Sequence, residues 1–209
     1  MLARCLTAIG VLLVVELSAA PAHAGPPMHC IAATLSANSQ ILVVNELTFD
    51  DPDETHARTV RKSTFRVYSR FSAANQGLLL DGPNSYWAHP MWSVVFESGR
   101  VSCPYTLVTD DGEFLVLFGL GFVGNALTIY RRQPLPGESF GGHGELVRGI
   151  PLSELWPSDR IQQTMSDNAP QWYTGGSFSF SADNRTLIHK TRWGQTRSID
   201  LPTGRVTNQ

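Results

Sequence analysis

The stretch Ser181-Ala182-Asp183-Asn184-Arg185-Thr186-Leu187-Ile188 shows most clearly the pattern that decides the fold of this 209-residue chain. A hydroxyl residue opens the pattern, small and Asx residues follow, and a run of β-branched and apolar residues ends it. Asx and Gly residues tolerate the positive φ of a tight turn, and the run that follows is typical of a strand. The pattern occurs twice more, as Ser36-Ala37-Asn38-Ser39-Gln40-Ile41-Leu42-Val43 and as Thr109-Asp110-Asp111-Gly112-Glu113-Phe114-Leu115-Val116.

The three copies are regularly spaced, because their starts at residues 36, 109 and 181 lie 73 and 72 residues apart. Each copy is followed by a second strand-like run, at 65–68, 127–130 and 198–201. Regular spacing of this kind indicates an internal repeat. We therefore predict an all-β fold of antiparallel meanders, related by a repeat of about 72 residues.

Short runs rich in Val, Ile, Thr and aromatic residues occur along most of the chain and predict strands. The predicted strands cover residues 41–44, 64–68, 92–96, 114–118, 127–130, 177–180, 186–188 and 197–201. At 151–165 the spacing of Leu152, Leu155 and Trp156 predicts one or two short helical turns. Residues 133–144 are rich in proline and glycine, so we expect a loop there.

The third copy resembles bacterial β-propeller repeats of the WD40-like kind, in which an Asp-containing turn opens one strand and a Thr-Gly turn closes a later one. The resemblance rests on Ser181-Ala182-Asp183-Asn184, Ile199-Asp200-Leu201 and Thr203-Gly204-Arg205-Val206. It implies a protein that binds or scaffolds. Ordinary blades recur at about 40–45 residues, and four or more close a ring. The longer spacing here leaves open a partial propeller, a sandwich of meanders or an assembly between chains.

Residues 1–24 have the features of a cleavable secretory signal peptide. Arg4 supplies a positive start, and the apolar run at 5–15 is shorter than the roughly 20 residues of a membrane-spanning helix. Small residues precede the expected cleavage site between Ala24 and Gly25. We expect the remaining chain to form a single all-β domain that is exported to the periplasm or the extracellular space.

Two cysteines, Cys30 and Cys103, lie beyond the expected signal peptide. A pair of cysteines in an oxidising compartment is usually bonded, and their separation does not match a zinc or Cys-x-x-Cys motif. Each lies six residues before a repeat turn, at Ser36 and at Thr109. We predict a disulfide between matching positions of neighbouring repeat units, and no metal site.

The charge balance argues against two classes of partner. The formal net charge is −2, and it is unchanged by loss of the signal peptide, which removes Arg4 and Glu16. This balance gives no electrostatic reason to bind nucleic acid or anionic lipid, and no later stretch is apolar enough to span a membrane. We expect neither partner, and the sequence permits an oligomer.

A glycine-rich stretch after the predicted strand 114–118 has the Gly-x-Gly-x-x-Gly spacing of a dinucleotide site, at Gly119, Gly121 and Gly124. Such a site needs a long helix next. Residues 127–130 are instead strand-like, and prolines follow. We predict a glycine-rich hairpin loop and no nucleotide cofactor.

Two further motifs resemble catalytic sites. Ser139 lies in a Gly-x-Ser-x-Gly pattern, with His189 further along as the base that an α/β-hydrolase would need. Proline and glycine flank that serine, and neither the strand nor the helix of a nucleophile elbow is predicted beside it. Residues 51–55 resemble phosphatase and calcium loops. His56 and Lys62 occupy the places where a calcium loop needs Gly and Glu, so we expect an acidic surface turn.

The sequence therefore favours an exported, non-catalytic binding or scaffolding protein, whose ligand is an unknown protein or small molecule. An exported serine hydrolase that uses Ser139 and His189 is the alternative. Aromatic residues in two segments could contribute to binding or to the core. They are Tyr86, Trp87, Trp92, Trp172 and Tyr173, with His89 beside them.

Overall fold

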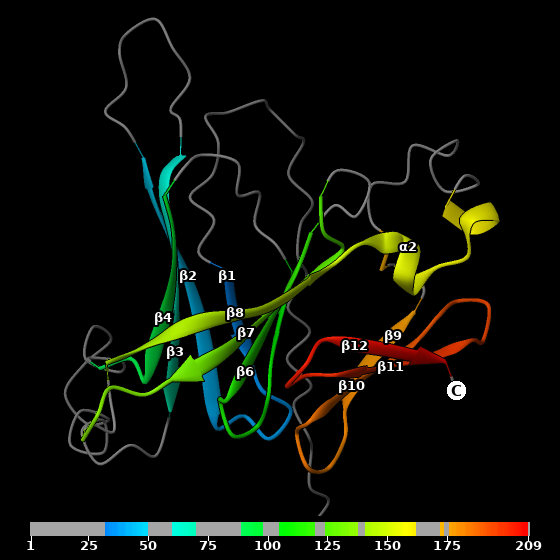
Figure 1. The fold of residues 1–209 in the computed structure, drawn as a ribbon. Coiled ribbons are helices and arrows are strands. Elements are labelled where there is room, and N and C mark those ends of the chain that lie inside the picture. The colour runs from blue at the N-terminus through cyan, green and yellow to red at the C-terminus, as the bar shows by residue number, and fades with distance from the viewer. Residues whose placement is uncertain are drawn as a thin grey trace, which may run out of the picture.

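The computed structural model in Figure 1 describes residues 32–49, 60–69, 89–97, 105–119, 124–137, 141–161, 172–173 and 176–208. Strands dominate these residues, which confirms the all-β prediction. The helical segments there are the turn α2 (Leu152–Leu155) and a second turn at 158–161, within the predicted 151–165. No helix in the described part of the chain is long and apolar enough to cross a membrane.

The strands form three consecutive four-stranded meanders. The first meander contains β1 (Ala32–Leu35), β2 (Ile41–Phe49), β3 (Val60–Ser69) and β4 (Trp92–Glu97). The second contains β5 (Thr106–Val108), β6 (Phe114–Phe118), β7 (Leu127–Gln133) and β8 (Gly142–Ile150). The third contains β9 (Ser177–Phe180), β10 (Thr186–Lys190), β11 (Thr196–Asp200) and β12 (Arg205–Asn208). Each repeat turn connects the first two strands of its meander.

Pairing between β4 and β8 joins the first two meanders into one sheet. Its strand order is β1-β2-β3-β4-β8-β7-β6-β5, whereas the third meander is a separate sheet of order β12-β11-β10-β9. The β4 and β8 strands run parallel over only two residue pairs, Trp92 with Gly142 and Ser93 with His143. All pairing within the meanders is antiparallel, as predicted.

The second meander lies between the other two, so both faces of its strand β6 are buried. All five residues of β6 are buried. Leu115 and Leu117 pack in a cluster with the first meander, whereas Phe114, Val116 and Phe118 pack toward the third. A strand buried on both faces reads as a continuous apolar run rather than an alternating one.

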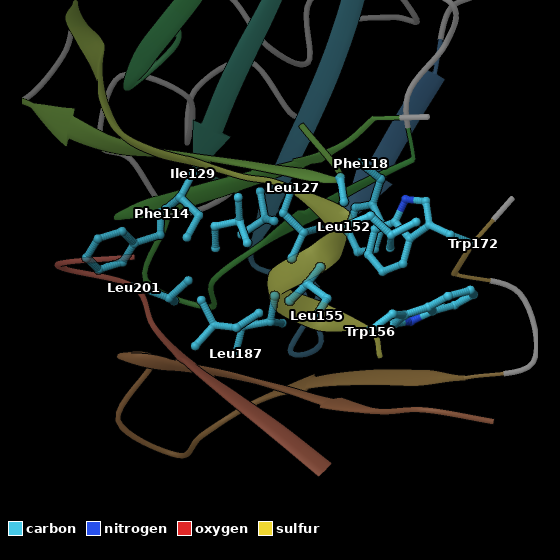
Figure 2. Packing of buried hydrophobic residues seen from close by; sticks show 14 residues of the cluster. Phe114, Phe118, Leu127, Ile129, Leu152, Leu155, Trp156, Trp172, Leu187 and Leu201 are labelled. Carbon is cyan, nitrogen blue, oxygen red and sulfur yellow. The ribbon is translucent and has the colours of Figure 1, made fainter. Parts of the chain in front are cut away.

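The core between the second and third meanders also includes α2. Figure 2 shows Leu152 and Leu155 of α2 beside Leu187 of the third meander and Leu127 of the second. The indole of Trp172 donates a hydrogen bond to the Gly119 carbonyl oxygen at 2.9 Å. Burial of these large side chains supplies most of the favourable free energy that holds the meanders together.

The core between the first and second meanders is centred on Trp92, which is fully buried. Its indole Nε1 donates a hydrogen bond to the Gly112 carbonyl oxygen at 2.7 Å. A Cβ atom at Gly144 would lie 2.3 Å from Val94 Cγ2 and 2.7 Å from the Trp92 ring. The glycine in β8 is therefore what allows the two meanders to approach this closely.

The predicted loop at 133–144 is wrong at both of its ends. Strand β7 continues to Gln133 and β8 begins at Gly142. Tight packing needs glycine at Gly142 and Gly144, so composition alone suggested a loop where the chain forms a strand. The short strands β1, β5 and β12 and the longer β8 were not predicted. The first three are only three or four residues long, and β8 contains glycine and pairs in part with the distant β4.

Candidate functional site: the three-strand cleft

The three repeat turns have the same hydrogen-bonded geometry. In each, the hydroxyl oxygen of the first residue accepts a hydrogen bond from the backbone N–H five residues later. The pairs are Ser36 with Ile41 at 3.1 Å, Thr109 with Phe114 at 3.0 Å and Ser181 with Thr186 at 3.0 Å. The same hydroxyl donates to the Asx side chain two residues later, in Asn38, Asp111 and Asp183. The three copies of the sequence pattern thus form the same set of hydrogen bonds.

The fourth residue of each turn has a positive φ, as the turn chemistry requires. The values are 60° at Ser39, 70° at Gly112 and 58° at Asn184. In the third turn, the hydrogen bond from Ser181 and then that from the backbone of Arg185 hold the pKa of Asp183 below its usual value. The charged carboxylate is therefore the form that fits this turn.

Hydrogen bonds also connect the turns to one another. The backbone N–H of Asn38 donates to Asp110 Oδ1 at 2.9 Å, and the backbone N–H of Asp110 donates to Asn184 Oδ1 at 3.4 Å. Between the first strands of two meanders, Thr106 Oγ1 donates to Thr34 Oγ1 at 2.7 Å. These contacts bring the ends of β1, β5 and β9 together on one side of the molecule.

All three of these strands lie at sheet edges. In an antiparallel ladder, alternate residues direct their backbone groups toward the partner strand and away from it. The turns fix which residues point outward, because the backbone N–H groups of Ser36, Thr109 and Ser181 bond to the next strand. The residues one and three positions earlier then direct their N–H and C=O groups to the free edge. They are Leu35 and Ala33 in β1, Val108 and Thr106 in β5, and Phe180 and Phe178 in β9.

A cavity of about 360 Å³ lies where these edges meet, and we call it the three-strand cleft. Leu35 lines it from β1, Leu107 and Val108 line it from β5, and the segment from Phe178 to Phe180 lines it from β9. Residues of all three repeat turns complete the lining. Among these described lining residues, Asp110 is the only charged one.

A second hollow of similar volume lies on the face of the third meander that points away from the core. Its lining consists of polar residues, namely Thr186, Ser198, Asp200, Thr203, Arg205 and Thr207. These residues come from one sheet and its last turn. The hollow lacks the apolar walls that usually line ligand pockets, so the three-strand cleft is the better candidate.

His189 lies in the core between the second and third meanders. It is 1% exposed, and its ring stacks on Phe178 with centroids 4.3 Å apart. Its Nδ1 atom has no hydrogen-bond partner among the described residues. Burial, with a smaller contribution from Arg197, lowers its pKa to about 4. The neutral imidazole therefore packs as an aromatic ring, an unfavourable setting for a base that must exchange protons with solvent.

Several predicted site residues lie outside the described residues. They are Ala24, Gly25, Cys30, Cys103 and Ser139, together with the acidic stretch 51–55 and the aromatic residues Tyr86 and Trp87. The disulfide, the cleavage site and the absence of a Ser139 nucleophile therefore stay predictions. Trp92 and Trp172, which the sequence left open as binding residues or core residues, lie in the core.

The glycine-rich stretch leads into a strand, as predicted. Strand β7 begins at Leu127, and the backbone N–H of Gly119 donates to the Ala126 carbonyl oxygen at 2.9 Å. A Cβ atom at Gly119 would lie 2.1 Å from the Asn125 carbonyl oxygen. Close backbone approach in the β6–β7 connection therefore accounts for this glycine.

Sequence reasoning missed the cleft because two of its three strands, β1 and β5, were not predicted. A usable signal was the residue before each turn, since Leu35, Val108 and Phe180 are all apolar. A search with family models and a search of curated proteins both found no match to this chain.

Proposed function

We propose that this chain is an exported, non-catalytic binding or scaffolding protein whose ligand binds in the three-strand cleft. One observation carries the proposal, namely three edge strands that pair with no further described strand and whose residues line a single cavity. Unpaired edges are prone to uncontrolled association, and proteins normally cover or blunt them. Apolar walls with a few fixed polar groups are also typical of ligand sites.

The framework around the cleft supports a role in binding. The turns are fixed by their own hydrogen bonds and by the bonds that connect Asn38, Asp110 and Asn184. Lining residues of β5 and β9 also belong to the two hydrophobic clusters, Val108 to one and Leu107, Phe178 and Phe180 to the other. A site on such a framework is preorganised, which lowers the entropic cost of binding.

The equivalent turns also support the proposed likeness to WD40-like propeller repeats, with each meander as one blade. The face-to-face stacking of the meanders fits this interpretation. The pairing of β4 with β8 departs from it, because this pair joins the last strands of two units in one sheet. We therefore propose a partial propeller in which two of the three blades are joined.

Export is supported by the signal-like segment 1–24 and by the cysteine pair.

The hydrolase alternative has a direct test. An activated fluorophosphonate probe should not label the protein, and labelling that is lost in Ser139→Ala would favour the hydrolase instead.

Photo-crosslinking in the producing cell tests the cleft. Benzoylphenylalanine is placed at Leu35, which lines the cleft and is 55% exposed, or at Leu146 in β8, which is 57% exposed and lies outside the cleft lining. We expect a discrete adduct of the exported protein from position 35 and none from position 146. The same adducts from both positions, or none from position 35, would contradict the proposal.

A further inference from the structure

We propose that the ligand is an extended peptide segment of a partner protein, which adds to the free edge of β9 as an extra strand. The inference rests on the proposed function and specifies its ligand class. Peptides that add to a sheet edge gain affinity from main-chain hydrogen bonds and specificity from alternate side chains. The following contacts select this mode and this edge.

The free edge of β9 offers a regular set of backbone groups. The backbone N–H of Ser181 bonds to Thr186, and Ser179 pairs with Ile188. Phe178 and Phe180 therefore direct their N–H and C=O groups away from β10. Neither residue has a hydrogen bond from these outward groups to another described residue. An added strand would supply the missing partners.

Of the three edges, β9 has the most open surroundings among the described residues. The edges of β1 and β5 approach one another, as the 2.7 Å bond between Thr34 and Thr106 shows. By contrast, the hydrogen bond that connects the second and third turns, from the backbone N–H of Asp110 to Asn184 Oδ1, lies at the end of β9. Three consecutive β9 residues line the cleft, so the cavity follows this edge.

The size of the edge sets the length of the peptide. Strand β9 has four residues, and a strand advances about 3.3 Å per residue, so roughly four peptide residues can pair. Leu35 and Leu107 supply apolar walls across the cavity. We expect apolar side chains at alternate peptide positions, pointing toward these walls.

The charge of the cleft sets the polarity of the peptide. Asp110 is the one charged residue among the described lining residues, and its carboxylate lies at the turn end of the cavity. A lysine or arginine at the end of the peptide would pair with it, whereas an acidic residue there would be repelled. The favoured segment is thus short, extended, alternately apolar and basic at one end.

The test begins with a random heptapeptide library displayed on phage and panned against the full mature protein. The best binder is then synthesised with blocked ends, and its affinity is measured by fluorescence anisotropy. The cleft is filled in Ala182→Trp, because Ala182 is an exposed lining residue of the third turn. Thr207→Trp, in the polar hollow of the third meander, is the matched control.

We expect Ala182→Trp to abolish binding and Thr207→Trp to leave it unchanged. Single N-methylation of the peptide should weaken binding about tenfold or more at alternate positions and little at the positions between them, because only alternate N–H groups face β9. Asp110→Asn, which keeps the oxygen that accepts the Asn38 bond, should reduce the preference for a basic over an acidic peptide end.

The outcomes separate the two proposals. Binding that Ala182→Trp abolishes but N-methylation does not alter would overturn strand addition and leave the cleft as the ligand site. Binding that persists in Ala182→Trp would count against the cleft itself. A library without cleft-dependent binders would overturn the peptide proposal, and the crosslinking at position 35 would still test the function. A dimer that Ala182→Trp dissociates would show that a second copy of the chain, not a partner peptide, occupies the edge.

Discussion

At the scale of single residues, one hydroxyl group organises each repeat turn. It accepts a bond from the next strand and donates one to an Asx side chain, so two polar groups lose a partner when it is removed. Burial of the group differs among the turns, since Thr109 is 0% exposed, Ser36 is 4% exposed and Ser181 is intermediate. Unsatisfied groups cost more free energy when they are buried.

We therefore predict that Thr109→Val lowers the free energy of unfolding by about 1–3 kcal/mol. Ser181→Ala should cost less, because water can replace the hydroxyl there. Urea denaturation of the mature protein measures both, with Ser177→Ala on the exposed face of β9 as the control. Equal losses for the buried and the exposed turn would show that the hydroxyl bonds do not set turn stability.

His189 makes a second prediction at this scale. The pKa of His189 is about 4 in the folded protein, below the ordinary histidine value of 6.5 that applies to the unfolded chain. The unfolded chain therefore binds the proton more readily. The free energy of unfolding therefore keeps its full value above pH 6.5 and decreases as the pH falls toward 4, by about 3 kcal/mol at most. His189→Phe should reduce this pH dependence. If NMR spectra of the folded protein showed the His189 imidazole titrating near pH 6.5, they would contradict the buried neutral form.

At the scale of elements, the sequence predicted what is local and missed what is long-range. The three turns were predictable, because their bonds join residues within five positions of one another. Strand β8 was not predictable, because the need for glycine at Gly144 comes from its packing against Trp92 and Val94, about 50 positions earlier in the chain. The cleft was missed for a related reason, because the described hydrogen bonds that bring the ends of β1, β5 and β9 together join residues 72 to 74 positions apart.

The packing of Gly144 in β8 can be tested directly. A Cβ atom there would overlap Val94 and the fully buried Trp92, and overpacking typically costs about 1–3 kcal/mol. We expect Gly144→Ala to lower the melting temperature by several degrees. His143→Ala, at the exposed neighbouring position, is the control and should change it little. An unchanged melting temperature in Gly144→Ala would mean that the first two meanders are not packed this closely.

At the scale of the whole molecule, the second meander is the layer that holds the other two. The predicted Cys30 to Cys103 disulfide would join the first and second meanders, just before β1 and β5. These strands lie beside one another at Thr34 and Thr106. The bond would close a loop of about 73 residues, which corresponds to a stabilisation of roughly 4 kcal/mol at most.

We expect reduction to lower the melting temperature by several degrees, and non-reducing peptide mapping to recover both cysteines in one linked fragment. The double variant Cys30→Ser, Cys103→Ser should melt at the temperature of the reduced protein. Two thiols that react freely with an alkylating agent in the native exported protein would contradict the bond.

The central claim is that three unpaired strand edges face one cleft, and amide hydrogen exchange tests it without any ligand. Residue-resolved NMR of the mature protein should show rapid exchange at the outward amides of Leu35, Val108 and Phe180. The amides of Thr34, Leu107 and Ser179, which face the neighbouring strands, should exchange slowly. Slow exchange at all six positions would contradict the claim, because it would mean that the edges are already paired.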